Sequence, residues 1–344
     1  MPTEPVPTSS RVPRFAGGGR IEWQDRQIPA PGPGELLVAI KANALCGSER
    51  GQFLDGSSVT PGHEAAGVVV AAGAGTSTPP GTAGVIYLMD FCGECRSCLL
   101  GYTNQCLRKR GDVGFNRDGG YGPFALIHEN IFFAVDADLP PAEATLLLDV
   151  MGTSAHALQR AQRVREDIAS IYIAGAGPVG LGILAMAKVT FGQAFPVLIS
   201  DVSAYRLRLA EQLGGLPVAV DEDGVEQGLR AHGWPEVDLA LDTSGRTEAR
   251  QACLRVLGKR GVLVCVGHGG ELNLRVSSDL IAPERAILGS EYFPFNSLPK
   301  NLDHLRRNRS YLRQIITHRF PVDEIQPAFE LFFRGATGKV VIEQ

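Results

Sequence analysis

Short apolar runs bounded by turn residues dominate the first part of the chain. From Arg14 to about Asp149, glycine and proline separate strand-like runs at 35–41, 66–70, 84–88 and 124–127. Short strands at this spacing are typical of a sandwich or barrel-like β domain. We therefore expect a β-rich domain over residues 1–150.

After Pro140 the pattern changes to strands that alternate with helices. Helical patterns cover 142–161 and 181–191, and apolar strands are predicted at 170–173, 196–199, 237–241 and 261–266. This alternation predicts an α/β fold with a doubly wound parallel sheet. We assign it to residues 151–290, and we expect residues 291–344, which end in a strand-like run at 339–342, to complete the first domain. An Arg-rich stretch at 306–319 has helical spacing of its apolar residues, namely Leu305, Leu312, Ile315 and Ile316.

The balance of charged residues and the absence of long apolar segments indicate which kinds of partner to expect. The 344 residues carry 33 Lys and Arg against 37 Asp and Glu, a net charge of −4, which lacks the basic excess of a dedicated nucleic-acid binder. Residues 1–14 have no apolar signal segment, and glycines and a proline interrupt the longest uncharged stretch at 171–187. We expect a cytoplasmic protein with a small-molecule substrate, without nucleic-acid or membrane partners.

A glycine motif follows the strand predicted at 170–173 and begins the next helix. Its residues are Gly175, Gly177, Pro178, Val179 and Gly180. This is the context of the dinucleotide fingerprint, in which the turn approaches a pyrophosphate at the helix N-terminus. Asp201 ends the next strand, where its carboxylate can accept hydrogen bonds from an adenosine ribose and would repel a 2′-phosphate. NAD is therefore expected rather than NADP. A glycine turn without a ligand is the alternative.

Cysteines cluster in one short segment. Four of the seven are Cys92, Cys95, Cys98 and Cys106. Four thiolates close the coordination sphere of a tetrahedral zinc ion, so this site is expected to be structural. An iron–sulfur cluster is the alternative, but the bacterial ferredoxin run ends in a three-residue gap followed by proline. Here the gap is seven residues and Leu107 follows.

A second candidate metal site is dispersed along the chain. Cys46 ends an apolar strand, His63 follows a short loop, and Asp149 precedes the second domain. Together they offer sulfur, nitrogen and oxygen donors. Three protein ligands leave zinc one open position for water or substrate, as in catalytic sites.

These motifs, in this order, resemble the zinc-containing medium-chain dehydrogenase/reductase family of alcohol, sorbitol and threonine dehydrogenases. The resemblance covers almost the whole chain, including 29–38, the four-cysteine segment, 118–121 and 338–342. It implies a GroES-like β-rich catalytic domain joined to a Rossmann domain. It further implies an NAD-dependent dehydrogenase of alcohols or polyols, or of the matching carbonyls, with two zinc ions per chain in a homodimer or homotetramer.

The resemblance also implies roles at the catalytic zinc. Cys46 and His63 match ligands, and Glu64 matches a glutamate that lies behind the metal and is a direct ligand in some members. Asp149 stands where alcohol dehydrogenases have cysteine and polyol dehydrogenases glutamate. Ser48 matches the residue that takes the alcohol proton, and Glu49 matches the carboxylate that orients the ligating histidine.

Cofactor contacts are implied in the same way. Arg206 matches a basic residue near the adenosine ribose, and Lys339 matches a pyrophosphate contact. Asp149, Thr153 and His156 together resemble the formaldehyde dehydrogenase branch. The alternative for His156 is that it only packs in the core. The alternative for His268, which also lies near cofactor positions, is that it is only a loop residue. The positions that match the nicotinamide side are Thr153, Val266, Ser290 and Tyr292.

Two departures from the family pattern leave the substrate open. Many members carry a histidine, which passes the proton to solvent, where this chain has Gly51, and the stretch from Gly51 to Pro61 is shorter than in polyol-type members. A biosynthetic dehydrogenase of an amino-cyclitol or of an amino acid such as threonine is therefore an alternative. A non-catalytic nucleotide-binding protein of the same fold is another.

Overall fold

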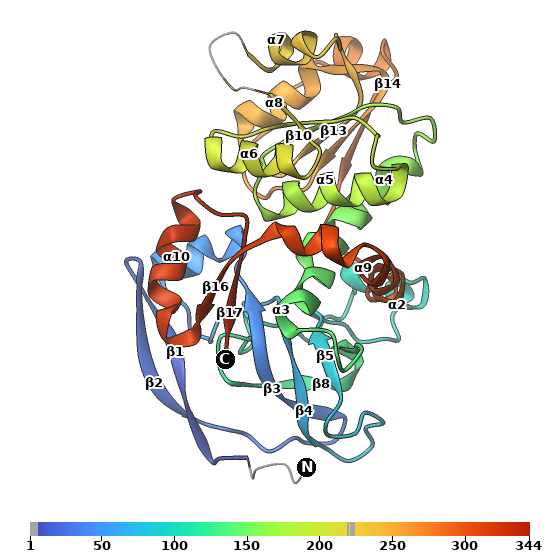
Figure 1. The fold of residues 1–344 in the computed structure, drawn as a ribbon. Coiled ribbons are helices and arrows are strands. Elements are labelled where there is room, and N and C mark those ends of the chain that lie inside the picture. The colour runs from blue at the N-terminus through green and yellow to red at the C-terminus, as the bar shows by residue number, and fades with distance from the viewer. Residues whose placement is uncertain (1–5, 219, 221–223) are drawn as a thin grey trace.

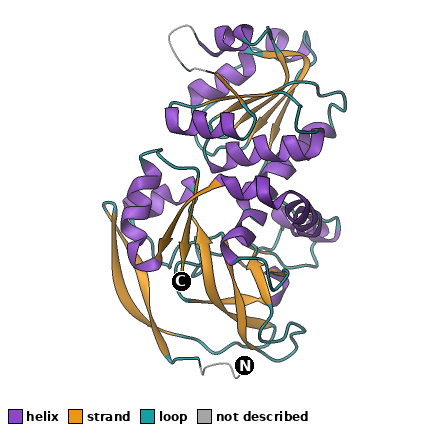
Figure 2. Cartoon of the chain, viewed as in Figure 1, coloured by secondary structure: helices purple, strands orange, loops and turns teal. Residues whose placement is uncertain are grey.

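Two large sheets lie in separate halves of the molecule, one above the other in the view of Figure 1 (Figures 1 and 2). The computed structural model describes residues 6–218, 220 and 224–344. The upper half holds a parallel sheet between helices, and the lower half holds a mostly antiparallel sheet. The predicted combination of a β-rich unit with a doubly wound sheet is confirmed.

The lower sheet combines strands from both ends of the chain. Its strand order is β16-β17-β3-β4-β5-β9, and β8 also pairs with β3. Strand β17 runs antiparallel to β3, with Val341 opposite Ala44, so the C-terminal segment is part of this sheet. A separate hairpin, β1 (Ser9–Gly17) and β2 (Arg20–Gln27), flanks it. The sheet strands are β3 (Glu35–Ala44), β4 (Ala65–Ala72), β5 (Ala83–Ile86), β8 (Phe124–His128), β9 (Phe132–Ala134), β16 (Ile316–Pro321) and β17 (Lys339–Glu343).

The upper sheet is parallel throughout, in the order β12-β11-β10-β13-β14-β15. This order reverses beside β10, which creates the switch point where such sheets bind ligands. Helices α4 and α5 cover the face turned toward the lower half, and α7 and α8 cover the other (Figure 1). The elements are β10 (Ile171–Ala174), β11 (Val197–Ser200), β12 (Leu216–Val218), β13 (Val237–Asp242), β14 (Leu257–Cys265), β15 (Ala286–Gly289), α4 (Ser154–Gln162), α5 (Pro178–Phe191), α6 (Ala204–Gln212), α7 (Gly224–Ala231) and α8 (Thr247–Arg255).

Two helical predictions need correction. The helix expected over 142–161 is divided into α3 (Pro141–Ala144), a 3-10 turn, a π turn (Asp149–Thr153) and α4, because Leu148 leaves helical geometry at φ −82° and ψ −112°. The helix expected over 306–319 is wrong beyond Ile315. There the chain becomes strand β16, since β17 offers an edge to pair with. The remaining elements include α1 (Arg50–Asp55), β6 (Met89–Asp90), α2 (Arg96–Leu99), β7 (Gly111–Asp112), α9 (Leu298–Leu312) and α10 (Ile325–Phe333).

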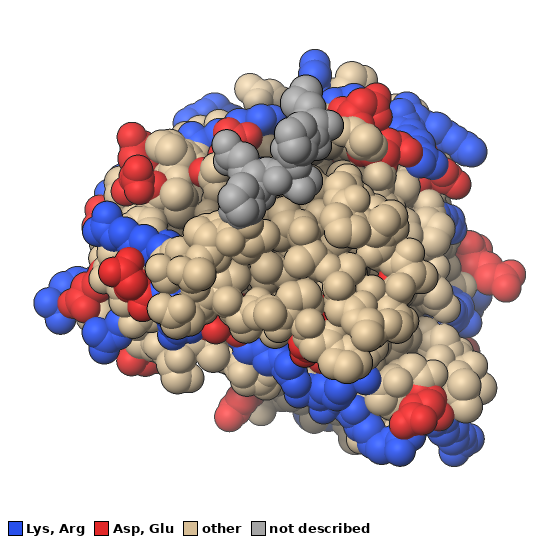
Figure 3. Space-filling model, turned by 90° about the horizontal axis from the view of Figure 1, so that it is seen from below, with Lys and Arg blue, Asp and Glu red and all other residues tan. Residues whose placement is uncertain are grey.

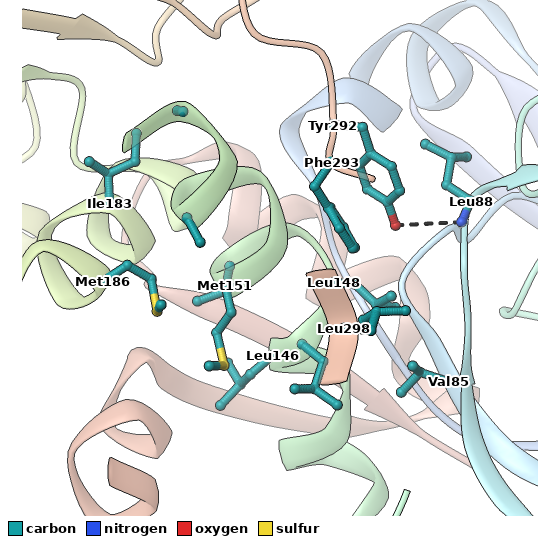
Figure 4. Close-up of a cluster of buried hydrophobic side chains, with 14 of the residues drawn as sticks. Val85, Leu88, Leu146, Leu148, Met151, Ile183, Met186, Tyr292, Phe293 and Leu298 are labelled. Carbon is teal, nitrogen blue, oxygen red and sulfur yellow. Dashed lines mark hydrogen bonds between the residues drawn. The ribbon is translucent and has the colours of Figure 1, made fainter. Parts of the chain in front are cut away.

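One continuous apolar core joins the two halves. Met151 from the π turn, Ile183 from α5 and Leu298 from α9 belong to the same buried cluster (Figure 4). Tyr292 contributes its ring to this cluster, and its hydroxyl accepts a hydrogen bond from the Leu88 amide at 3.5 Å. Each fully buried side chain of this size contributes about 2 kcal/mol. The apolar contact region between the two halves is therefore firmly packed.

Figure 3 shows the charged side chains on one face of the molecule. In the view from below, lysine, arginine and acidic residues alternate around the rim, and the centre of the face is uncharged (Figure 3). Among the described residues, no helix combines the length and the apolar character needed to cross a membrane.

Candidate active site and metal centres

A cleft of about 760 Å³ lies where the two halves meet. The lower half contributes Cys46, Ser48 and His63 to its wall. The upper half contributes the glycine turn at 175–180 and Asp201, at the carboxyl ends of the parallel strands. The candidate metal ligands and the candidate nucleotide site thus share one cavity.

Four candidate ligands from distant parts of the chain converge at the lower wall of this cleft. Side-chain donor atoms of Cys46, His63, Glu64 and Asp149 all lie within 4.8 Å of one another. Asp149 Oδ2 is 3.1 Å from Cys46 Sγ and 3.4 Å from His63 Nε2. The structure therefore brings together the three dispersed residues singled out in the sequence, with Glu64 beside them.

Strand ends and turns position these side chains. Cys46 follows β3 and precedes a 3-10 turn, His63 and Glu64 directly precede β4, and Asp149 begins the π turn. Gly62 has φ +106°, and a Cβ there would lie 2.8 Å from the Tyr121 amide nitrogen, so only glycine fits before His63. The segment around 119–121 holds this loop through backbone hydrogen bonds to residues 60–62.

Glu49 orients the cluster from behind. Its Oε1 lies 3.1 Å from His63 Nδ1, and its Oε2 accepts hydrogen bonds from the Tyr121 hydroxyl at 2.7 Å and from the Cys46 amide at 3.2 Å. Glu49 is fully buried. A carboxylate on Nδ1 leaves Nε2 directed at the other donors, which is the arrangement that prepares a histidine for a metal.

Ionisation in the cluster reflects burial and crowding. Burial opposes the charged form of Asp149, but the hydrogen bond and positive charge of His63 outweigh it and lower the pKa of Asp149 to about 2. Burial, followed by the Asp149 charge, raises the pKa of the Cys46 thiol. The same two causes raise the pKa of Glu64 to about 8. A divalent cation would reverse these effects on the thiol and on Glu64, so the donor set fits a metal ion.

Lys339 supplies a positive charge behind the cluster. Both it and Glu64 are fully buried, and its ammonium group pairs with Glu64 Oε1. The expected contact of Lys339 with a pyrophosphate is therefore wrong, because the side chain is enclosed in the lower sheet and already engaged. Lys339 begins β17, and β17 pairs with β3, the strand that leads to Cys46, which explains the position of the lysine.

The four cysteines of the 92–106 segment form a second cluster. Their sulfurs are 3.5 Å apart for Cys95 and Cys98, 3.6 Å for Cys92 and Cys106, and 3.9 Å for Cys95 and Cys106. A tetrahedral zinc ion with Zn–S bonds of about 2.3 Å requires edges of about 3.8 Å. The distances are far from the roughly 2.05 Å of a disulfide.

Backbone amides support thiolates in this segment. The amide of Cys95 donates to Cys92 Sγ at 3.3 Å, and that of Leu107 donates to Cys95 Sγ at 3.4 Å. Backbone hydrogen bonds lower the pKa of Cys95 to about 6, whereas burial raises the pKa of Cys98 to about 12. The donors and their spacing fit a tetrathiolate metal site.

The glycine turn has the shape that a pyrophosphate needs. Gly175 has φ +100°, and a Cβ on Gly180 would lie 1.9 Å from the Gly175 carbonyl oxygen, which explains the close contact of helix and strand. At Gly177 the nearest atom to an added Cβ is 3.9 Å away. The open space at Gly177 faces the cleft at the N-terminus of α5, where an anion is favoured.

Asp201 and Arg206 lie at the far end of the cleft. Asp201 accepts the amides of Ala176 at 2.7 Å and Ser203 at 2.8 Å, one on each carboxylate oxygen. It thereby braces the glycine turn, and each oxygen keeps further acceptor capacity. Arg206 donates from Nε to the Thr337 carbonyl at 3.1 Å, and burial lowers its pKa although the Asp201 charge opposes this.

The residues expected at the nicotinamide side line the middle of the cleft. Thr153, Val266, Ser290 and Tyr292 all border it. The hydroxyls of Thr153 and Ser290 are buried and have no hydrogen-bond partner in the described part of the chain. Tyr292 has φ 45°, a left-handed backbone that costs about 1 kcal/mol outside glycine. Unpaired hydroxyls and local strain in one place fit a polar ligand.

Other expected positions are distributed around the site. Ser48 is exposed to the cleft, and Gly51 is exposed on α1 with open space around it. His156 is buried on α4, where burial lowers its pKa to about 4. His268 is exposed and lies 3.2 Å from a carboxylate oxygen of Glu291.

Several residues that line the cleft lie outside the sequence motifs and were not predicted as site residues. Arg246 follows the parallel strand β13, and Arg334 follows α10 from the C-terminal segment. Arg50 stacks on Phe333 at 5.3 Å and joins that segment to α1. The position of Arg246 after a parallel strand could have predicted it, because ligands bind at the carboxyl ends of such strands. The place of Arg334 depends on how the C-terminal segment folds back.

Comparisons with known proteins match both parts of the chain to described families. Residues 32–137 match the family described as the alcohol dehydrogenase GroES-like domain, and residues 178–307 match the zinc-binding dehydrogenase family. The two matches cover both sides of the cleft.

Individual relatives extend over nearly the full chain. An uncharacterized zinc-type alcohol dehydrogenase-like protein of Escherichia coli strain K12, YphC, is 27% identical over 95% of this chain and 96% of its own. The L-threonine 3-dehydrogenase of Shewanella frigidimarina is 30% identical over 92% and 94%. A crystal structure of a short chain alcohol dehydrogenase from E. coli CFT073, complexed with NADH, superposes with a TM-score of 0.87 at 20% identity and covers 98% of this chain and 100% of its own.

Proposed function

The chain belongs to the zinc-binding alcohol dehydrogenase family, and we propose that it oxidises a hydroxyl group of a small alcohol or polyol, or reduces the matching carbonyl, with NAD as its preferred cofactor. It is a zinc-dependent oxidoreductase that acts on CH–OH groups with a nicotinamide cofactor. One observation carries the finer proposal: the cluster of Cys46, His63 and Asp149 opens into the same cleft as the glycine turn.

The residues of the lower half have complementary tasks in this reaction. Cys46, His63 and Asp149 would hold a zinc ion and leave one tetrahedral position open, with Glu64 behind it. When bound, the zinc supplies Lewis acidity that lowers the pKa of a substrate hydroxyl, and the nicotinamide supplies the hydride acceptor. Ser48, exposed in the cleft, receives the proton of that hydroxyl at Oγ. Glu49 keeps the His63 ring in its orientation.

The proton then leaves Ser48 by a route of its own. Gly51 offers no side chain for a relay, and its surroundings are open to solvent. We infer that water or the cofactor ribose takes the proton. A Gly51→His variant has room for the imidazole and provides the direct test, since a relay that it restores would shift the pH profile of turnover.

The upper half selects and orients the cofactor. The Gly177 space and the N-terminus of α5 would take the pyrophosphate, and Asp201 would take the adenosine ribose. The Asp201 charge supports NAD over NADP, since it would repel a 2′-phosphate. Asp201→Asn removes this charge but keeps an acceptor oxygen. We expect the preference for NAD over NADP, measured as kcat/KM, to fall at least about tenfold, the effect of about 1.4 kcal/mol.

Two zinc ions per chain complete the proposal. The four-cysteine cluster would hold a structural ion, and Cys46, His63 and Asp149 the reactive one. Metal analysis of the intact protein should find two zinc ions, and Cys95→Ser should retain one. We also infer a homodimer or homotetramer in the cytoplasm, which rests on family resemblance, and light scattering of the purified protein measures the oligomeric state.

The decisive experiment is a substrate panel on zinc-replete protein. Alcohols, polyols, carbonyl compounds and amino alcohols, including threonine, are offered with NAD or NADP, or with the reduced cofactor for carbonyls, and nicotinamide absorbance is followed. Threonine belongs in the panel because a threonine dehydrogenase is 30% identical to this chain. Cys46→Ser should abolish turnover yet retain NAD binding, whereas Cys253→Ser, a buried thiol within α8, should retain both. No turnover with any compound would overturn the proposal.

A further inference from the structure

A second cavity, of about 470 Å³, lies beside the main cleft, and most of its lining has no part in the proposed reaction. Its walls come from three places: the four-cysteine segment at Tyr102 and Asn104, helix α4 at His156 and Arg160, and the ends of β14 and β15. It shares part of its lining, including Ser290 and Glu291, with the main cleft. The cavity is therefore a side chamber of the cleft.

The side chamber contains several polar groups that nothing in the described chain satisfies. The Arg160 Nε and the Asn104 side-chain oxygen are buried atoms without a hydrogen-bond partner among the described residues. The Ser290 hydroxyl is also unpaired, but it lies on the wall that the chamber shares with the nicotinamide side of the main cleft. Asn104 and Ser290 are only 6% and 8% exposed. Leaving such groups unpaired costs about 1–3 kcal/mol each. Unpaired groups of this kind around one chamber are expected where a polar ligand completes them.

Charge in the side chamber points to an anion. The Nε of the Arg160 guanidinium has no hydrogen-bond partner among the residues that the structure describes. The carboxylate of Glu291, the acidic group of the lining, faces His268 at 3.2 Å instead. His156 stands beside Arg160 and stays neutral near pH 7, because burial lowers its pKa to about 4. Arg160 is thus the cation of the chamber.

The remaining polar atoms indicate what else the ligand carries. The Asn104 amide nitrogen is engaged with the Glu291 carbonyl at 2.7 Å, so its oxygen is free to accept. An acceptor would repel a bare anion but would bind a hydroxyl donor. The Ser290 hydroxyl can act in either sense. A guanidinium beside an acceptor therefore matches an anion that also bears hydroxyl groups.

We propose that the side chamber binds the carboxylate or phosphate group of a small hydroxylated molecule, with Arg160 as its charged partner and Asn104 accepting from a neighbouring hydroxyl. Because the chamber shares walls with the main cleft, the group is either the remote end of the substrate or a separate small anion. If the group belongs to the substrate, the proposal rests on the proposed function. If it belongs to a separate anion, the proposal is independent of that function.

The test compares Arg160→Gln with Arg163→Gln in zinc-loaded, NAD-saturated protein. Arg163 is exposed at the end of α4 and does not line the chamber, so its variant removes the same charge from the same region. Inorganic phosphate is the probe, titrated by calorimetry. Loss of a charge-assisted hydrogen bond should weaken binding at least about tenfold in Arg160→Gln. Arg163→Gln should bind as the wild type does, and Arg160→Lys, which keeps the charge, should bind better than Arg160→Gln.

Matched substrates distinguish the two sources of the anion. Polyols and the same polyols bearing a terminal phosphate or carboxylate are compared by kcat/KM. A selective loss for the anionic members in Arg160→Gln assigns the chamber to the substrate. Phosphate binding that depends on Arg160, with all kcat/KM values unchanged, assigns it to a separate ligand. Equal phosphate affinity in wild type, Arg160→Gln and Arg163→Gln, or no binding to any of them, overturns the proposal. Failure of the dehydrogenase proposal would instead appear as absent turnover, with the phosphate titration unaffected.

Discussion

Lys339 and Glu64 form a fully buried ion pair although 275 residues separate them in the chain. The pair joins the last strand, β17, to the residue beside His63. The carboxylate next to the metal cluster thus keeps its charge balance only when the C-terminal segment is in place. The charge environment of Glu64 therefore depends on strand β17, which also completes the lower sheet.

Removal of this lysine should be costly. In Lys339→Met the buried carboxylate of Glu64 loses its ammonium partner, and we expect a loss of about 3 kcal/mol in the free energy of unfolding. The double variant Lys339→Met, Glu64→Gln should recover part of that loss, because no uncompensated charge remains. Urea unfolding of the zinc-loaded proteins measures both. Equal stability of wild type and Lys339→Met would contradict the role of the pair.

Glu49 should control metal affinity without touching the metal. Glu49→Gln weakens the hold on His63 Nδ1, and loss of such a partner lowers zinc affinity by about 10–100-fold. Tyr121→Phe removes one hydrogen bond from the same carboxylate and should have a smaller effect. Competition with a chromophoric chelator measures the affinity of the more weakly held ion. Unchanged zinc affinity in Glu49→Gln would show that Cys46 and Asp149 alone position the site.

Two glycines of the turn should respond in opposite ways to alanine. In Gly180→Ala the new Cβ would collide with the Gly175 carbonyl, which should destabilise the protein by about 1–3 kcal/mol. In Gly177→Ala the Cβ meets nothing closer than 3.9 Å, so stability should be preserved. The methyl group then occupies space needed for a pyrophosphate, and NAD affinity should fall.

Thermal unfolding and NAD titration of these two variants separate the effects. The expected pair of results is a lowered Tm for Gly180→Ala and a normal Tm with weakened NAD binding for Gly177→Ala. Normal NAD binding by Gly177→Ala would place the pyrophosphate elsewhere.

His156 should make stability depend on pH below neutrality. Burial, followed by the charges of Arg160 and Arg163, lowers its pKa from an ordinary value of 6.5 to about 4 in the folded protein. Between these values the unfolded chain binds a proton that the folded protein does not. The contribution of His156 to the free energy of unfolding is thus fully present above about pH 6.5 and is lost as the pH falls toward 4.

The variant His156→Gln should lack this component. Urea unfolding at pH 8 and at pH 5 measures it: the loss of stability between the two should be smaller in the variant than in the wild type. An identical loss in both proteins would show that the histidine is accessible to protons in the folded state.

Much of the fold and site could be predicted because its signals are local. The glycine turn lies between one strand and the next helix, and the four cysteines lie within one segment. Their spacing along the chain constrains their separation in space, whatever the rest of the protein does. The alternation of strands and helices likewise indicated the parallel sheet.

Predictions failed where long-range pairing overrode local preference. Ile316 continues a helical pattern in the sequence, yet it begins strand β16 because β17 presents an edge. Lys339 sits at a position that resembled a pyrophosphate contact, yet in the folded chain its side chain is fully buried and pairs with Glu64. In both cases backbone pairing and burial contribute more free energy than the local pattern.

The residue types and their spacing along the chain predicted the kinds of chemistry present: a dinucleotide turn, a tetrathiolate cluster, and a dispersed set of sulfur, nitrogen and oxygen donors. The folded chain was needed to show that Asp149 meets Cys46 and His63, that Lys339 pairs with Glu64, and that Arg160 and Asn104 line the same cavity. The physical reason is that contacts between distant segments depend on which strands pair and which faces pack. Spacing along the chain does not encode those choices.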